Sequence, residues 1–81
     1  MNMSEAVAHR LIELCKEKEI SFYELAFLSG VPESTVRYMS RGDRSNPKLR
    51  NLKRVCDGLE VSLYDFFDTD YFRTLEPELE S

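Results

Sequence analysis

The chain has 81 residues, a formal net charge of −4, and a composition that is 42% hydrophobic and 32% charged. A chain of this length buries roughly 60–65% of its unfolded surface, enough for one small core but not for a deep catalytic cavity, so we expect no catalytic residues and no enzyme. No apolar run approaches the roughly 18 residues needed to cross a bilayer, and the N-terminus does not resemble a signal peptide, which predicts a cytoplasmic protein without a membrane partner.

Helical signals begin close to the N-terminus. Val7, Leu11 and Leu14 recur at the spacing of one helix face, which predicts a first helix over about Ser4 to Lys18. The next segment, Ser21-Phe22-Tyr23-Glu24, is a capping box, and the apolar residues on either side of it are placed for a hydrophobic staple. Gly30 supplies the left-handed residue that ends this second helix.

Three further helices are predicted. Pro32 can open the third, because a first-turn residue has no intrahelical use for its N–H, and Gly42 ends it. Asn46-Pro47 caps and opens the fourth, and Ser62-Leu63-Tyr64-Asp65 repeats the capping box before the fifth. The sequence therefore predicts an all-α fold, a compact five-helix bundle over residues 1–67, followed by an acidic C-terminal tail over residues 68–81.

Cationic residues gather in the middle of this acidic chain. Residues 34–54 hold seven of the eleven Lys and Arg residues against one acid, so the charges of 1–33, 34–54 and 55–81 are −3, +6 and −7. Such asymmetry predicts an anionic partner for the middle segment. The third helix has one polar, cationic face, on the side opposite Pro32, Val36 and Met39, and its members are Ser34, Arg37, Tyr38 and Arg41.

Residues 10–67 resemble the Cro/C1-type (XRE-like) helix-turn-helix domain of phage repressors and small bacterial regulators. The resemblance rests on the series Ser21…Leu25-Ala26…Gly30-Val31…Val36…Gly42…Asn46-Pro47…Leu49…Leu52, then Leu59…Val61-Ser62-Leu63. It implies a lambda-repressor-like bundle whose second and third helices form the helix-turn-helix, and a sequence-specific, DNA-binding transcriptional regulator, expected to be a repressor. The chain departs from the family pattern at four positions: Phe22 replaces a common Gln, Ser40 a common Glu, and Glu19 and Glu60 replace common glycines.

The predicted partner is double-stranded DNA, with the third helix in the major groove. The polar face and the resemblance together predict that the base-reading residues are Glu33, Ser34, Thr35, Arg37 and Tyr38. Phosphate-binding residues are predicted at both ends of this helix pair: Ser21, Phe22, Tyr23, Arg41, Arg44, Asn46, Lys48 and Asn51. An acid at a helix N-terminus also stabilises the helix dipole without any ligand, so both roles stay open for Glu33.

Nine aromatic residues exceed what a core of this size needs. Tyr64, Tyr71 and Phe72 are predicted to form the contact of a weak homodimer, and the alternative is that the rings seal the fifth helix onto the bundle. An alternative function is a protein-interaction module of the same fold, such as an antitoxin or anti-repressor, with a protein partner on the acidic tail. Cys15 and Cys56 lack metal-ligand spacing, so we expect reduced thiols, no metal and no cofactor.

Overall fold

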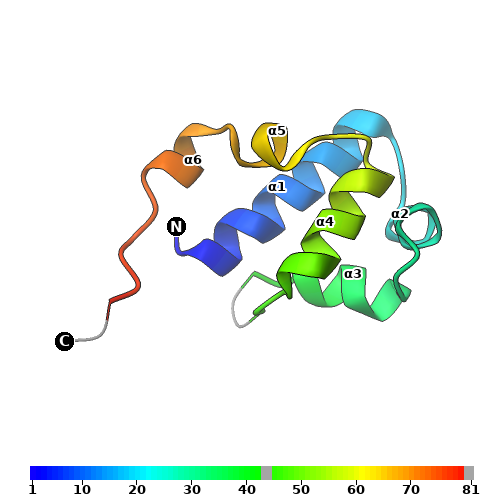
Figure 1. Cartoon of the computed structure of the whole chain (residues 1–81), viewed down its shortest axis with the longest axis horizontal. Helices are drawn as coiled ribbons and strands as arrows, with labels where there is room; N and C mark the ends of the chain where they lie inside the picture. Colours follow the sequence, from blue (N-terminus) through cyan, green and yellow to red (C-terminus); the bar gives the residue numbers. More distant parts are fainter. Residues whose placement is uncertain (43–44, 80–81) are drawn as a thin grey trace.

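We describe residues 1–42 and 45–79 of the chain in a computed structural model, in which they form six α-helices and no strand (Figure 1). The helices are α1 (Met3–Lys18), α2 (Phe22–Ser29), α3 (Glu33–Met39), α4 (Leu49–Gly58), α5 (Leu63–Phe67) and α6 (Asp70–Arg73). The predicted all-α fold is confirmed, but the predicted count of five helices is one too low. The additional helix, α6, forms because the side chain of Thr69 accepts a hydrogen bond from the Phe72 N–H and caps a new turn.

The helix pair α2 and α3 is bounded as the local signals predict. The hydroxyl of Ser21 accepts a hydrogen bond from the Glu24 N–H at 3.1 Å, and the Glu24 carboxylate accepts one from the Ser21 N–H at 3.2 Å, which completes the capping box. Gly30 then ends α2 in the left-handed conformation, with φ of +69°. The α2–α3 turn is therefore determined by residues adjacent to it.

Three other helix boundaries differ from the prediction. Helix α1 starts before Ser4, because Asn2 and Glu5 form a capping box that the sequence analysis missed. Pro32 is the extended N-cap of α3 and not its first helical residue, with ψ of 148°. The same helix ends at Met39, before the predicted stop at Gly42, with Ser40 as its C-cap.

Helix α4 begins at Leu49, two residues later than the predicted opening at Pro47. Contacts with α1 and α3 explain why α4 starts later in the chain than predicted. The backbone N–H of Asn46 donates a hydrogen bond to the Tyr38 hydroxyl at 2.7 Å, and the carbonyl of Ser45 accepts one from the Ser4 hydroxyl. These two bonds hold the preceding segment against α1 and α3 in a non-helical conformation, so the helix starts only after it.

The core lies between α1 and the other helices, with α4 packed against both α2 and α5 (Figure 1). Leu49, which shares the apolar spacing of the fourth helix, is an exception at 71% exposure, because it is the first residue of α4 and lies at the edge of the bundle. The two cysteines are buried free thiols, and burial raises the pKa of Cys56 to about 11. Buried large side chains come from five helices and from Leu59, the C-cap of α4: Val7, Leu11, Leu14, Leu25, Val36, Met39, Leu52, Val55, Leu59 and Phe66.

Two departures from the family pattern leave the backbone geometry intact. Glu19 and Glu60, which stand where glycine is common, adopt left-handed conformations with φ of 54° and 59°. A side chain in that region costs about 1–2 kcal/mol relative to the right-handed one, so each turn forms against a local energy cost. The packing of the flanking helices α1, α2, α4 and α5 therefore holds these turns.

The segment after residue 67 contacts the bundle. Helix α6 packs against α1, and the Phe72 ring lies 4.9 Å from that of Phe67 between centroids. Further along, the Glu76 N–H donates a hydrogen bond to the Met1 carbonyl at 3.2 Å. The division into a domain over residues 1–67 and a tail over residues 68–81 stays a prediction.

Candidate nucleic-acid interface

Helix α3 has a buried side and an exposed, cationic side. Val36 and Met39 are fully buried, whereas Arg37 and Arg41 are exposed, which agrees with the predicted division of the helix. Pro32 is the exception, because it precedes the helix and is exposed instead of facing inward. The exposed side of α3, with Arg37 on it and Arg41 just after the helix, is therefore accessible to a partner.

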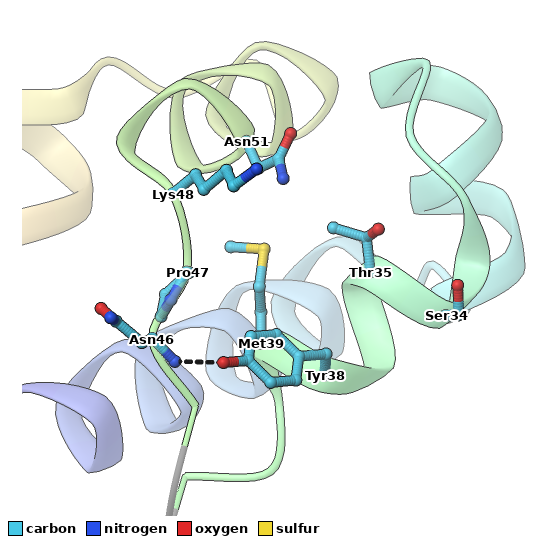
Figure 2. Close-up of a pocket in the computed structure, with 8 residues that line it drawn as sticks. All are labelled: Ser34, Thr35, Tyr38, Met39, Asn46, Pro47, Lys48 and Asn51. Atoms are coloured by element: carbon cyan, nitrogen blue, oxygen red, sulfur yellow. Dashed lines mark hydrogen bonds between the residues drawn. The ribbon is translucent and has the colours of Figure 1, made fainter.

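A hollow of about 280 Å³ lies between α3 and the start of α4 (Figure 2). Thr35, Tyr38 and Met39 line it from α3, while Lys48 and Asn51 face them from the α4 side (Figure 2). Three predicted base-reading residues thus line the same hollow as three residues predicted to bind phosphate. These six residues are Ser34, Thr35, Tyr38, Asn46, Lys48 and Asn51, and Met39 and Pro47 complete the lining.

Tyr38 connects the two sides of this hollow. Its hydroxyl oxygen accepts the hydrogen bond from the Asn46 N–H, shown dashed in Figure 2, while 38% of the residue stays exposed. Because the oxygen is the acceptor, the hydroxyl proton is available to donate to a phosphate or a base acceptor. The bond also fixes the distance between α3 and the segment that leads into α4.

Arg37 is held by two residues of the helix-turn-helix. The Arg37 Nε and Nη2 atoms lie 2.6 and 2.5 Å from one carboxylate oxygen of Glu33, one helical turn earlier. The guanidinium carbon lies 5.7 Å from the centroid of the Phe22 ring, in cation–π contact across the turn. The sequence analysis missed this cluster, although the i,i+4 spacing of Glu33 and Arg37 is a recognisable ion-pair signal.

The N-terminal end of α4 faces the same side. Its N-cap, Lys48, makes no side-chain capping bond, so the first-turn N–H groups lack the partner that a capping side chain provides. These N–H groups, the positive end of the helix dipole and the exposed Lys48 side chain suit an anionic group. Asn51, in the first turn, adds a neutral side chain at the wall of the hollow.

The remaining predicted phosphate-binding residues lie outside the hollow. The Ser21 hydroxyl is engaged in the capping box, and Tyr23 on α2 is 70% exposed. Phe22 is half-buried, with its side chain packed against the core. The predicted contact at Arg44 lies outside the described residues.

The three aromatic residues predicted at a dimer contact have different surroundings. Tyr71 packs edge-on against His9 and donates a hydrogen bond to the Glu13 carboxylate at 3.2 Å, while Phe72 packs against the rings of α5. Burial raises the pKa of the Tyr71 hydroxyl. Tyr64 is 76% exposed and borders an apolar hollow of about 440 Å³ with Leu63 and Phe67.

Residues 1–42 and 45–79 contain no group of three or more His, Cys, Asp or Glu side chains placed to hold a metal ion. Within the same ranges, no helix is long and apolar enough to cross a membrane.

The pattern of the Cro/C1-type HTH DNA-binding domain matches residues 10–70. The match covers α2 and α3 together with the hollow and the start of α4. It extends beyond the helix-turn-helix, from Arg10 in α1 through α5 to Asp70.

Individual proteins resemble the chain over most of its length. The chain is 40% identical over 62 residues to the HTH-type transcriptional regulator SlrR of Bacillus subtilis. The aligned residues cover 75% of this chain and 41% of SlrR, so the chain spans less than half the length of that relative. SinR of the same species is 29% identical over 75 residues, covering 93% of this chain and 68% of SinR. The crystal structure of prophage Lp1 protein 11 superposes with a TM-score of 0.78 at 30% identity, covering 93% of this chain and 100% of that one.

Proposed function

The chain belongs to the Cro/C1-type helix-turn-helix DNA-binding domain family, and from this premise we propose that it regulates transcription, as a repressor, by binding a specific sequence in duplex DNA. Helix α3 enters the major groove, where Ser34, Thr35 and Tyr38 reach base edges. The start of α4 binds the adjacent phosphates. The proposal involves no catalytic step and no cofactor, and it places the protein in the cytoplasm with its DNA partner.

The observation that supports the proposal is the hollow between α3 and the start of α4. Ser34, Thr35 and Tyr38 line one hollow together with Lys48 and Asn51 of the α4 end. Base edges and the phosphate backbone lie next to each other in duplex DNA, so a protein that reads sequence needs both kinds of group on one surface. The segment from 34 to 54, with a charge of +6, supplies the attraction that brings DNA to this surface.

Replacing single residues separates base reading from phosphate binding. Arg37→Ala should cost about 1–3 kcal/mol at one base pair and relax the preference there, because the guanidinium provides donors for guanine O6 and N7. Lys48→Ala should weaken binding to all sequences to a similar extent, because a phosphate contact carries no sequence information. Selection from a random duplex pool, followed by affinity measurements on single-base variants of the selected site, distinguishes the two effects.

The control for this pair is Lys18→Ala, since Lys18 is an exposed cation at the end of α1 and outside the hollow. It should leave both affinity and base preference unchanged. Equal losses on all sequences from Arg37→Ala would assign Arg37 to the DNA backbone. A wild-type protein that selects no sequence would favour the alternative of an interaction module such as an antitoxin or anti-repressor.

We also propose a weak homodimer in which Tyr64 of each copy enters the apolar hollow beside Tyr64 of the other. The hollow is lined by Leu63, Phe67 and the ion-paired residues Asp68 and Arg73. Tyr64 is the best of the three predicted contact residues, because Tyr71 and Phe72 already pack within the chain. Figure 1 places α5 on the opposite side of the bundle from α3, so this contact leaves α3 uncovered.

Tyr64→Ser should raise the dimer dissociation constant at least about tenfold, because burying one such ring on each copy contributes about 1.5–3 kcal/mol. Sedimentation equilibrium over a range of concentrations measures the change. Tyr23→Ser is the matched control, since Tyr23 is a tyrosine of similar exposure on α2. A wild-type chain that is monomeric at high concentration, and binds DNA as one copy per site, would contradict the dimer.

The acidic segment over residues 68–81 is proposed as the surface for a possible protein partner. It carries five of the eight acids of residues 55–81, and Asp68 and Asp70 already pair with Arg73. Glu76 and Glu78 are exposed, and the Glu76 carboxylate lies 3.9 Å from the N-terminal amine. Glu78 forms no ion pair with any described residue and is the acid of this segment best placed to meet a cationic partner.

A further inference from the structure

Arg37, Glu33 and Phe22 form one cluster across the helix-turn-helix. Glu33 and Arg37 come from α3, whereas Phe22 is the first residue of α2. The Arg37 guanidinium carbon lies over the Phe22 ring, 5.7 Å from its centroid, and the Nε and Nη2 edge faces the Glu33 carboxylate. Two contacts from different helices therefore restrain the group, although the Arg37 side chain is 63% exposed.

We propose that Phe22 and Glu33 are positioning residues that set the orientation in which Arg37 meets DNA, and that Phe22 thereby determines specificity at one base pair. The proposal rests on the proposed function, since it requires the chain to read duplex DNA. A long arginine side chain on a helix surface otherwise samples many rotamers. Holding it in one orientation removes part of the entropy cost of binding a base.

The hydrogen-bond donors of Arg37 indicate how it would meet a base. The guanidinium has five N–H donors, and the Nε–Nη2 edge is occupied by Glu33. The outer edge, made by one N–H of each terminal nitrogen, is the remaining pair that can bridge O6 and N7 of a single guanine. We therefore expect Arg37 to contact guanine through its two terminal nitrogens while its Nε–Nη2 edge stays paired with Glu33.

Phe22 is suited to this role and poorly suited to a direct phosphate contact. Its ring has no hydrogen-bond donor, so only its backbone N–H could bind a phosphate. The ring is packed against the core on one side, which fixes its position, and carries the guanidinium on another. An aromatic ring that the core holds in place can bind a cation at a fixed position through a cation–π interaction.

Position-specific base preference is the measurement that tests the proposal. Duplex sequences are selected with wild type and with Phe22→Leu, which keeps an apolar side chain against the core but removes the ring. The preference for guanine at the Arg37 base pair should fall about three- to tenfold in Phe22→Leu. The dependence of affinity on salt should stay unchanged, because no phosphate contact is lost.

Rescue and control variants separate positioning from a structural role. Phe22→Tyr keeps the ring and should restore the preference to within about twofold of wild type. Phe27→Leu removes another aromatic ring of α2, which is 81% exposed and has no predicted DNA contact, and should leave the preference unchanged. Glu33→Gln should alter the preference at the same base pair as Arg37→Ala, because it acts through Arg37. Circular dichroism and thermal unfolding check that each variant is folded.

The outcomes distinguish this inference from the proposed function. If wild type selects a sequence but folded Phe22→Leu keeps the full preference, the positioning role of Phe22 is wrong and the DNA-binding function stands. If Glu33→Gln changes a different base pair, Glu33 reads that base itself and does not act through Arg37. If wild type binds no duplex, the proposed function fails and the inference fails with it.

Discussion

Raising the salt concentration from about 50 to about 200 mM should weaken duplex binding by the chain roughly 150- to 1,800-fold. Each phosphate that a cation neutralises releases condensed counterions, so log K falls with log salt at about −0.9 per contact. We expect about four to six contacts per copy, which gives a slope of about −3.6 to −5.4. Lys48, Arg50 and Arg54 are exposed and form no ion pair with any described residue, so they are available for such contacts.

Fluorescence anisotropy of a labelled duplex, titrated at several salt concentrations, measures this slope. Lys48→Ala should make it shallower by about 0.9, whereas Lys18→Ala should leave it unchanged. A wild-type slope shallower than about −2 would contradict phosphate binding by this surface.

The largest effect on folding is expected from Phe66→Ala, which should lower the free energy of unfolding by about 3–5 kcal/mol. Phe66 is the largest fully buried side chain, and its ring lies edge-on to Phe67 with centroids 5.3 Å apart. Its carbonyl accepts a hydrogen bond from Arg10 Nε at 2.8 Å, which docks α5 onto α1. Alanine would leave a cavity where α5 meets the other helices. A small domain has only about 5–15 kcal/mol of stability in total, so the variant should be close to unfolding.

Urea denaturation followed by circular dichroism measures the loss. Tyr64→Ala is the matched control, because it truncates an aromatic residue on the same helix that is 76% exposed. At protein concentrations where the chain is monomeric, this control should change stability by no more than about 0.5 kcal/mol. A loss below about 1.5 kcal/mol for Phe66→Ala would mean that the helices close around the missing ring.

The candidate site was predictable where a residue's role depends on its own helix. The exposed position of Arg37, and the buried positions of Val36 and Met39, follow from the period of α3, and the structure agrees with them. The periodicity could not indicate that Tyr38 accepts a hydrogen bond from the Asn46 N–H, because these residues lie on different segments. It also could not distinguish Tyr64, which is exposed, from Tyr71, whose ring packs against α1.

Local signals are sufficient to predict the all-α fold, the α2–α3 turn and the cationic surface of α3, because capping boxes, glycine and helical periodicity act over a few residues. The start of α4 and the neighbours of Arg37 could not be predicted in this way. Each of these depends on how close two separate segments come, as with the Phe22 ring and the Arg37 guanidinium. That distance depends on how the core packs α2 against α3, and local sequence signals do not contain it.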